Sequence, residues 1–249
     1  KTRRASGRRS PLAAAALSAV LLATPALAQD EDPFLWLEGV DDARALAWAE
    51  AENAKTAQVL ETDPRYGAML AEARAIFTAK DRIPTPSFRA GGVDNLWQDA
   101  EHPHGLWRHT SRASYRAAEP AWETLIDLDA LARTEGRRWF FKGAVCLKPD
   151  ETTCLVRLSD GGGDAVELRE FDTRTKRFVE GGFRFAEGKQ YVQWLDRDTL
   201  VMGREWTPGE VTASGYPYVL KIIGRDGAAR EIFRGRKADV WAQPAVLYG

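Results

Sequence analysis

Few residues of this 249-residue chain could do chemistry, and the three histidines are the first to consider. His102, His104 and His109 are the only histidines, and they lie within eight residues of one another. A His-x-His pair on a β-strand places both rings on one face, as a metal site requires. Pro103 interrupts that pair, however, and no distant Cys or His completes a ligand set. We therefore interpret all three as ordinary surface histidines and expect no metal site.

Motifs for a nucleophile or for phosphate binding are absent. A hydrolase serine typically lies in a Gly-x-Ser-x-Gly turn, and no such pentapeptide occurs. Ser214 has a turn-like neighbourhood without a preceding apolar strand, so we interpret it as a loop residue. The run Gly161–Gly163 is not followed by Lys-Ser/Thr, and it predicts a hairpin turn. We assign no catalytic or cofactor-binding residue and expect no cofactor.

The two cysteines, Cys146 and Cys154, flank a short loop with Pro-Asp turn chemistry. On adjacent hairpin strands they would face each other, and in an exported protein they could oxidise. Closing so short a loop stabilises a protein by about 2–3 kcal/mol on the chain-entropy estimate. We predict a structural disulfide, with two buried thiols, or a catalytic or metal role, as the alternatives.

The first 28 residues have the order of a secretory signal peptide. A basic stretch, Lys1–Arg9, precedes an apolar run, Leu12–Ala23, and a small-x-small triplet, Ala26–Ala28. The apolar run is shorter than the ~20 residues that span a bilayer, and no later segment is apolar enough to do so. We expect cleavage after Ala28, a periplasmic location and no membrane span in the mature protein. The chain starts at Lys, so we also expect an incomplete N-terminus.

Composition narrows the function classes. The chain is 44% hydrophobic and 29% charged, which excludes a disordered protein. The formal net charge is −1, and five of the basic residues fall in the signal peptide, so the mature body is mildly acidic. Such a body gives no reason to expect nucleic-acid binding. Two cysteines are too few for a disulfide scaffold or a zinc ribbon.

Two predicted helices over residues 41–79 precede a long series of short strands. Asp41 or Asp42 can cap the first helix, and Asp63-Pro64 is a typical start for the second. From Ile83 onward the strand candidates are Asn95–Asp99, Leu106–Thr110, Thr124–Leu128, Trp139–Lys142, Cys154–Leu158, Ala165–Phe171, Tyr191–Leu195, Thr199–Gly203, Tyr218–Ile223 and Arg230–Phe233.

The strand spacing indicates antiparallel sheet in a sandwich, a barrel or a propeller. Hairpin turns recur with an Asp-Gly or Asp-x-x-Thr theme, and four-stranded units of about 40–50 residues match one propeller blade. We therefore favour a mainly β fold with a partial β-propeller. The predicted division is a signal peptide over 1–28, a helical segment over 29–80 and a partial propeller over 81–249.

The opening of the mature chain resembles a known family. Asp32–Glu38, followed by Ala47–Asn53, is similar to the start of prolyl oligopeptidase family serine peptidases. The resemblance spans nearly the whole mature chain and is closest to the exported bacterial branch, which also has paired cysteines at positions 146 and 154. Its further segments are Asn95–Asp99, Gly105–Arg108, Tyr115, Ala121–Asp129, Lys142–Ala144, Arg169–Asp172 and Ser214–Pro217.

The resemblance implies a two-domain enzyme in which a seven-bladed β-propeller covers an α/β-hydrolase domain and admits only short peptides. The N-terminal helical segment would pack on that hydrolase domain. A Ser, an Asp and a His would follow in that order in a C-terminal portion. The chain stops in mid-pattern at Gly249, so we expect it to hold about the first half of the propeller and no catalytic residue.

The resemblance therefore predicts the N-terminal part of an exported serine peptidase that cleaves short peptides after proline, with this part inactive alone. Its expected partners are short peptide substrates and the C-terminal hydrolase domain. One alternative is an exported, non-catalytic propeller that acts as a binding module. Another is a relative that cleaves after basic residues or releases dipeptides. The sequence leaves open the cleavage preference, the oligomeric state and whether the truncation is natural.

Overall fold

The structure is a computed structural model, and it describes residues 32–39, 42–83 and 85–248. The predicted signal peptide over 1–28 lies outside the described residues. The chain divides into two compact units, residues 1–67 and 68–249, which are described separately below. Within the described ranges, no helix combines the length and the apolar character that crossing a bilayer requires.

The first unit contains the short 3-10 helix η1, Leu35–Glu38, and the helix α1, Ala43–Leu60. Of the two predicted caps it is Asp42 that begins α1, because its Oδ1 accepts the backbone N–H groups of Arg44 and Ala45, both at 2.9 Å. Trp36 of η1 meets Trp48 of α1 edge to face at 6.2 Å. The contact between the two indoles holds η1 against α1.

The helix α2, Tyr66–Thr78, follows the predicted Asp63-Pro64 start. Its large apolar side chains are mostly exposed in the structure. Met69 is 64% exposed and Phe77 is 74% exposed. Both helices expected over residues 41–79 are therefore confirmed.

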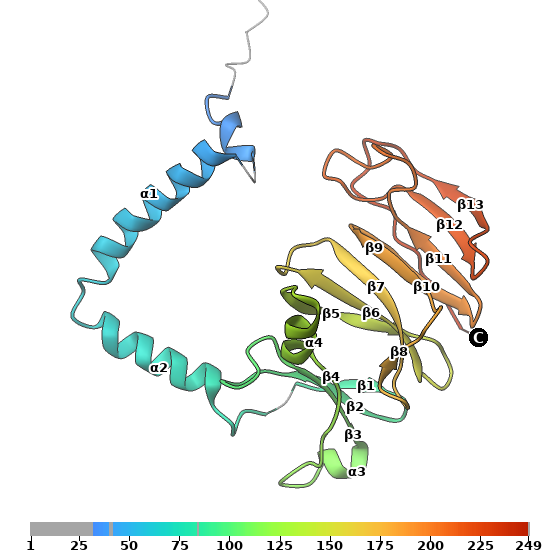
Figure 1. The fold of residues 1–249 in the computed structure, drawn as a ribbon, viewed down its shortest axis with the longest axis horizontal. Helices are drawn as coiled ribbons and strands as arrows, with labels where there is room; N and C mark the ends of the chain where they lie inside the picture. The colour runs from blue at the N-terminus through green and yellow to red at the C-terminus, as the bar shows by residue number, and fades with distance from the viewer. Residues whose placement is uncertain (1–31, 40–41, 84, 249) are drawn as a thin grey trace, which may run out of the picture. The chain divides into compact units, whose positions relative to one another are not determined.

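The second unit is built from three antiparallel sheets, each of which follows the previous one along the chain (Figure 1). Sheet 1 consists of β1 Ser87–Arg89, β2 Gly92–Trp97, β3 Leu106–Ser111 and β4 Glu123–Asp127. Sheet 2 consists of β5 Trp139–Cys146, β6 Thr153–Asp160, β7 Val166–Asp172, β8 Arg177–Phe178 and, beside β7, β9 Arg184–Gly188. Sheet 3 consists of β10 Tyr191–Asp196, β11 Thr199–Gly203, β12 Val219–Gly224 and β13 Ala229–Arg234.

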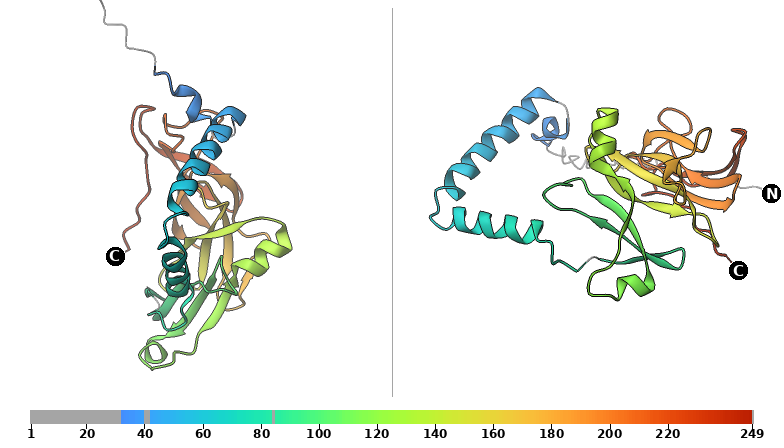
Figure 2. Two further views of the ribbon diagram at one scale, coloured as in Figure 1. Left: turned by 90° about the vertical axis from the view of Figure 1, so that its left-hand side faces the viewer. Right: turned by 60° about the horizontal axis from the view of Figure 1, so that its bottom comes forward.

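Sheet 2 lies between the other two sheets, and both of its faces are buried (Figure 2). Side chains alternate across a strand, so β6 sends Val156 and Leu158 toward sheet 1 and Leu155 toward sheet 3. These three side chains are fully buried. On the sheet 3 side, the indole N–H of Trp194 donates to the carbonyl of Val145 at 2.8 Å. Two separate hydrophobic cores thus join the three sheets.

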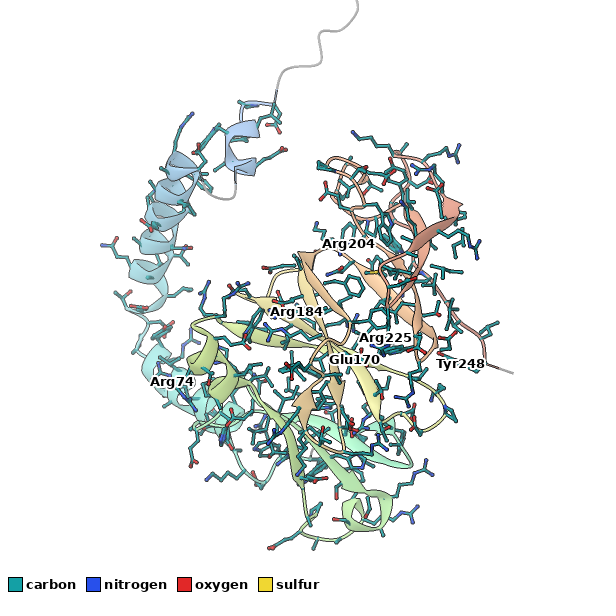
Figure 3. All side chains as sticks on the ribbon, turned by 45° about the vertical axis from the view of Figure 1, so that its right-hand side comes forward. Arg74, Glu170, Arg184, Arg204, Arg225 and Tyr248 are labelled. Atoms are coloured by element: carbon teal, nitrogen blue, oxygen red, sulfur yellow. A yellow bond between two sulfur atoms is a disulfide. The ribbon has the colours of Figure 1, made fainter. Side chains whose placement is uncertain are left out.

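An ion pair adds to the packing of sheet 3 on sheet 2. The guanidinium of Arg225, after β12, donates to both carboxylate oxygens of Glu170 on β7, at 2.8 and 2.9 Å (Figure 3). Such a two-pronged pair fixes geometry as well as adding attraction. The two sheets therefore have a paired arginine at their junction in addition to their apolar core.

Two short helices in the second unit were not predicted. They are α3, Arg112–Tyr115, and α4, Leu128–Glu135. The strand candidate Thr124–Leu128 runs one residue into α4, because the Asp127 side chain accepts the Ala130 N–H at 2.8 Å and caps the helix. Gly136, with φ of 65°, ends α4 in the left-handed conformation.

The mainly β fold class with a partial propeller is confirmed. Each sheet contains four consecutive antiparallel strands in order, to which sheet 2 adds β9 beside β7, and the sheets pack face to face through apolar cores. The first strands of sheets 2 and 3, β5 and β10, are in contact. The division of the mature chain between residues 80 and 81 stays a prediction.

Candidate functional site

A cavity of about 280 Å³ lies between sheets 1 and 2. Sheet 1 contributes Arg89, Asp94 and Trp107 to its wall, and sheet 2 contributes Gly143 and Glu151. The turn between β1 and β2 brings backbone of sheet 1 to the edge of this cavity. The polar groups of these residues decide what the cavity can do.

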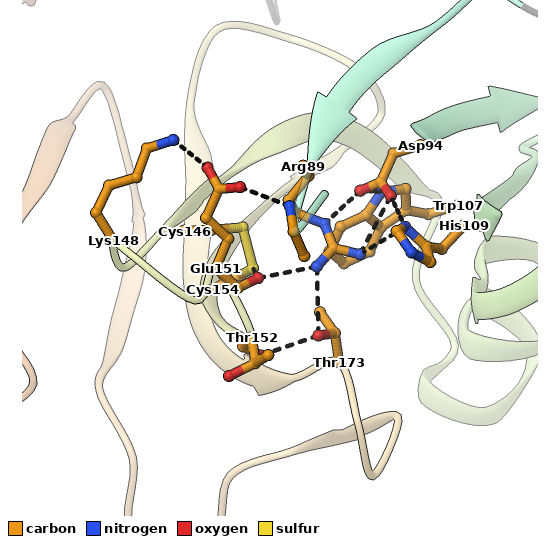
Figure 4. Close-up of polar contacts among 11 residues, drawn as sticks. Arg89, Asp94, Trp107, His109, Cys146, Lys148, Glu151, Thr152, Cys154 and Thr173 are labelled. Carbon is orange, nitrogen blue, oxygen red and sulfur yellow. Dashed lines mark hydrogen bonds and ion pairs between the residues drawn. A yellow bond between two sulfur atoms is a disulfide. The ribbon is translucent and has the colours of Figure 1, made fainter. Parts of the chain in front are cut away.

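Asp94 is the centre of the polar cluster, which we call the Arg89 junction (Arg89, Asp94, Trp107, His109, Glu151 and Thr173). Asp94 is 4% exposed and Arg89 is 8% exposed. The carboxylate of Asp94 accepts from Arg89 Nε at 2.5 Å and from the Trp107 indole at 3.1 Å, and it lies 2.5 Å from His109 Nδ1 (Figure 4). A buried carboxylate is stable only when it is paired and hydrogen-bonded. This one meets that condition.

Arg89 also reaches from sheet 1 into sheet 2. Its Nη1 donates to the carbonyl of Glu151 at 2.8 Å and contacts the hydroxyl of Thr173 at 3.4 Å. Next to it, the N–H of Ala90 donates to the Glu151 carboxylate at 2.5 Å. The Arg89 junction therefore fastens the first sheet to the β5–β6 loop of the second.

The β5–β6 loop is closed by the two cysteines. Cys146 and Cys154 occupy opposing positions of β5 and β6, and the structure joins them in a disulfide. The bond lies at the base of the loop that carries Glu151 (Figure 4). The predicted pairing is thus compatible with the fold, and its oxidation in the cell stays a prediction.

Glu151 is held in its ionised form. Burial by itself raises the pKa of this carboxyl, but Lys148, the Ala90 N–H and the nearby Arg89 charge outweigh burial and lower its pKa below the ordinary value. Lys148 forms an ion pair with Glu151. The charge of Glu151 therefore balances that of two cations, and the loop keeps its position through them.

The histidines do not converge. Each places Nδ1 against a different carboxylate: His102 on Asp99 at 3.0 Å, His104 on Asp129 at 2.7 Å and His109 on Asp94 at 2.5 Å. Their side chains are 28, 29 and 22% exposed, so the three histidines lie at the surface and each turns one ring nitrogen inward to a carboxylate. Each carboxylate draws its histidine partly into the fold. No group of His, Cys, Asp and Glu in the described part of the chain could hold a metal ion.

The other predicted positions behave as expected. Ser214 is exposed in the connection between β11 and β12, where its carbonyl accepts from Lys189 at 2.7 Å. Gly161 and Gly162, with φ of 80° and 87°, form the turn between β6 and β7. The loop residue and the hairpin turn are confirmed.

The Arg89 junction was not found from the sequence. Arg89 and Asp94 lie five residues apart across one hairpin, but Glu151 is 62 positions from Arg89 and no sequence pattern links it to them. The one available signal was Asp94, a charged residue inside a strand. In the structure the carboxylate of Asp94 and the guanidinium of Arg89 are hydrogen-bonded on several sides, so the cluster can hold two sheets together.

The comparisons with known proteins fit this architecture. The family model for the prolyl oligopeptidase N-terminal β-propeller domain matches residues 25–245. An uncharacterised peptidase of Sinorhizobium fredii is 50% identical over 220 residues, which are 87% of this chain and 30% of that protein. An uncharacterised peptidase of Rickettsia prowazekii is 33% identical over 209 residues, 80% of this chain and 29% of that protein.

Solved structures agree with the sequence relatives. A post-proline cleaving enzyme from Rickettsia typhi superposes with a TM-score of 0.75 at 32% identity, over 84% of this chain and 31% of that enzyme. A structure of prolyl endopeptidases superposes with a TM-score of 0.61 at 15% identity, which shows the likeness of fold alone. The chain spans about 30% of the length of the curated relatives it matches. It belongs to the prolyl oligopeptidase family of peptidases and carries the N-terminal β-propeller domain of that family.

Proposed function

We propose that the whole protein is an exported serine peptidase that cleaves short peptides after proline. This chain would supply its N-terminal helical segment and part of its propeller. One observation carries the proposal: 84% of the chain superposes on the post-proline cleaving enzyme of Rickettsia typhi at 32% identity. The family membership of the chain supports the same reaction class.

The proposed chemistry is that of a Ser-His-Asp triad. A serine attacks the carbonyl carbon after proline, a histidine takes the proton and later gives it to the leaving amine, and an aspartate orients the histidine. The three residues would lie in the hydrolase portion of the whole protein, beyond residue 249. The described part of the chain has no hydrogen bond between a serine or threonine hydroxyl and a histidine, so its contribution is architectural.

The proposed task of the propeller is to control which substrates reach the triad. Rigid sheets are needed for that task, because a gate that deforms would admit folded proteins. The two buried cores and the Arg89 junction supply such rigidity. Short, flexible peptides would then be the molecules able to pass.

The reaction can be tested on the full-length protein with fluorogenic peptides. A peptide with proline before the scissile bond is compared with matched peptides that carry alanine or lysine there, and with a dipeptide-release substrate. We expect cleavage after proline only, and covalent labelling by a fluorophosphonate probe that reacts with activated serines. Cleavage after lysine, or dipeptide release, would move the protein to one of the alternative specificities. Neither cleavage nor labelling would favour the binding module.

Export needs a separate test, because it rests on residues 1–28 alone. Those residues can be fused to an alkaline phosphatase that lacks its own signal peptide and is active only outside the cytoplasm. We expect phosphatase activity from the fusion and none from a Leu21→Arg control, whose charge interrupts the apolar run. Equal activity of both fusions would contradict export through this segment.

A further inference from the structure

A second cavity, of about 260 Å³, lies between sheets 2 and 3, and its charges are not balanced. Lys142, Arg157 and Lys189 contribute three cationic side chains to its lining, and Asp164 contributes the one carboxylate. That carboxylate already accepts a hydrogen bond from the hydroxyl of Tyr216 at 2.7 Å. We call this space the Arg157 cavity.

Arg157 occupies an unusual place. It lies two residues after Leu155 on β6, on the face that turns toward sheet 3, where Leu155 is fully buried. Its Nε is buried and has no partner, and no ion pair or hydrogen bond to Arg157 occurs among the described residues. Burial lowers the pKa of its guanidinium. Arg157 as a whole is partly exposed, but a buried polar atom without a partner is costly, so a ligand that pairs with the guanidinium would gain by binding.

The backbone of β5 makes room for the guanidinium. At Gly143, φ is 99°, and a Cβ there would lie 2.9 Å from Arg157 Nη2. The pairing register between β5 and β6 shifts between Phe141 and Ala144, around this glycine. The neighbouring Lys142 is exposed and has no partner among the residues that the structure describes. Two unpaired cations are thus placed at the edge of one cavity.

Gln190 supplies a hydrogen-bond acceptor to the same lining. It is 5% exposed, and its amide nitrogen donates to the carbonyls of Val166 at 2.6 Å and Ala186 at 2.9 Å. These two bonds fix the amide, and its Oε1 is left buried without a partner. In the described part of the chain, Arg157 Nε and Gln190 Oε1 are the two buried side-chain polar atoms without a partner. Both residues line the Arg157 cavity.

Aromatic rings form the remaining wall. Tyr191 and Tyr216 stack with ring centres 6.4 Å apart and planes 11° apart. Lys189 lies over the Tyr216 ring at 4.3 Å and donates to the carbonyl of Ser214 at 2.7 Å. Lys189 therefore already has interaction partners within the protein, whereas Lys142 and Arg157 are available to pair with an anion. The tyrosine faces offer an apolar surface beside that anion.

We propose that the Arg157 cavity binds the carboxylate of a peptide, which pairs with the guanidinium of Arg157 and the ammonium of Lys142. This proposal rests on the proposed function only in taking the bound peptide to be a substrate of the peptidase. The carboxylate could belong to the C-terminus of the peptide or to an Asp or Glu side chain. In either case the cavity favours peptides that carry a negative charge.

Binding can be measured without cleavage. The probes are Gly-Gly-Ala tripeptides labelled at the N-terminus with an uncharged fluorophore, which lack proline and have either a free C-terminal carboxylate or a C-terminal amide, and a similarly labelled Gly-Glu-Ala amide as the third. Fluorescence anisotropy with the full-length protein gives the dissociation constants. We expect the free acid or the glutamate peptide to bind about tenfold more tightly than the neutral amide, as for a charge-assisted hydrogen bond. Preference for the free acid assigns the C-terminus as the source, and preference for the glutamate peptide assigns the side chain.

Matched variants locate the effect. Arg157→Met and Lys142→Met should each reduce or abolish the preference, and Lys142 is exposed, so its variant guards against a failure of Arg157→Met to fold. Arg174→Met removes a cation at an exposed turn of the same sheet and should keep the preference. Equal binding of all three peptides by the unmodified protein, or an unchanged preference in both cavity variants, would overturn the proposal. The proline-peptide assay decides the proposed function separately, because the anisotropy measurement does not depend on cleavage.

Discussion

Each junction between neighbouring sheets contains an arginine, which is buried at the first junction and partly exposed at the second, and the two arginines differ in their partners. Arg89, between sheets 1 and 2, donates to a carboxylate, a carbonyl and a hydroxyl. Arg157, between sheets 2 and 3, has a buried Nε without a partner. The second junction has its own ion pair, Arg225 with Glu170, so its packing does not need Arg157. An arginine whose N–H groups are hydrogen-bonded within the protein holds the fold together, whereas an arginine with a buried N–H group that has no partner indicates a place for a ligand.

The largest expected effect is on stability. Replacing Arg89 by methionine should destabilise the fold strongly, whereas the same substitution at Arg157 should change its stability little. Arg89→Met leaves Asp94 buried without its cation, so we expect the free energy of unfolding to fall by about 3–5 kcal/mol. Arg157→Met removes an unpaired charge from an apolar face, so we expect stability within about 1 kcal/mol of the unmodified protein, or above it. Urea denaturation followed by tryptophan fluorescence measures both. Equal losses in the two variants would contradict the distinction between the junctions.

The disulfide should stabilise the protein without affecting the Arg157 cavity. Replacing Cys146 and Cys154 together by serine opens a short loop, and we expect a loss of about 2–3 kcal/mol in unfolding free energy. The carboxylate preference should remain, because neither cysteine lines that cavity. Mass spectrometry of the unreduced peptide that contains both cysteines tests the bond itself. A pair of free thiols in the purified protein, prepared without reductant, would contradict the prediction.

Replacing Gly143 by a residue with a side chain should lower both the stability of the protein and its affinity for the carboxylate. The φ of 99° at Gly143 is unfavourable for any residue with a side chain, and a Cβ would crowd Arg157. We expect Gly143→Ala to cost about 1–3 kcal/mol of stability and to weaken carboxylate binding. Gly163→Ala is a matched control, because nothing lies within 4 Å of a Cβ at that position. Similar losses of stability and of carboxylate affinity in both variants would show that Gly143 has no special role beside Arg157.

The smallest expected effect concerns pH. The pKa of Glu151 is lower in the folded than in the unfolded protein, so its charge stabilises the fold above the unfolded value of about 4.3. That contribution disappears as the pH falls through the folded pKa. Glu151→Gln should therefore be less stable than the unmodified protein at pH 7, and the two should approach each other near pH 3. A difference that stays constant from pH 7 to pH 3 would contradict this linkage.

Local signals predicted the fold well. Asp42 begins its helix as expected, and the Gly-rich turn after β6 joins two strands as expected. Alternating apolar residues placed most strands within a few positions. The short helix α4 was missed although Asp127 and Gly136 are typical caps, because its eight residues follow a strand-like run without a break.

The sites were beyond the reach of sequence patterns. Arg89 meets Glu151 across 62 positions, and Gln190 meets Val166 across 24. Such partners are brought together by the stacking of sheets and have no characteristic spacing along the chain. The histidines show the converse relation, since three residues that are close in sequence contact three different aspartates.

The central strand β6 also matters before the protein has folded. Because both of its faces are buried, its sequence is almost uniformly uncharged from Thr152 to Ser159, with Arg157 as the exception. A segment of high β-propensity and low charge aggregates readily while it is still exposed, and a single charge within it slows self-association. Arg157 therefore protects the newly made chain, and its replacement by methionine would lower the yield of soluble protein during refolding even where the native state is equally stable.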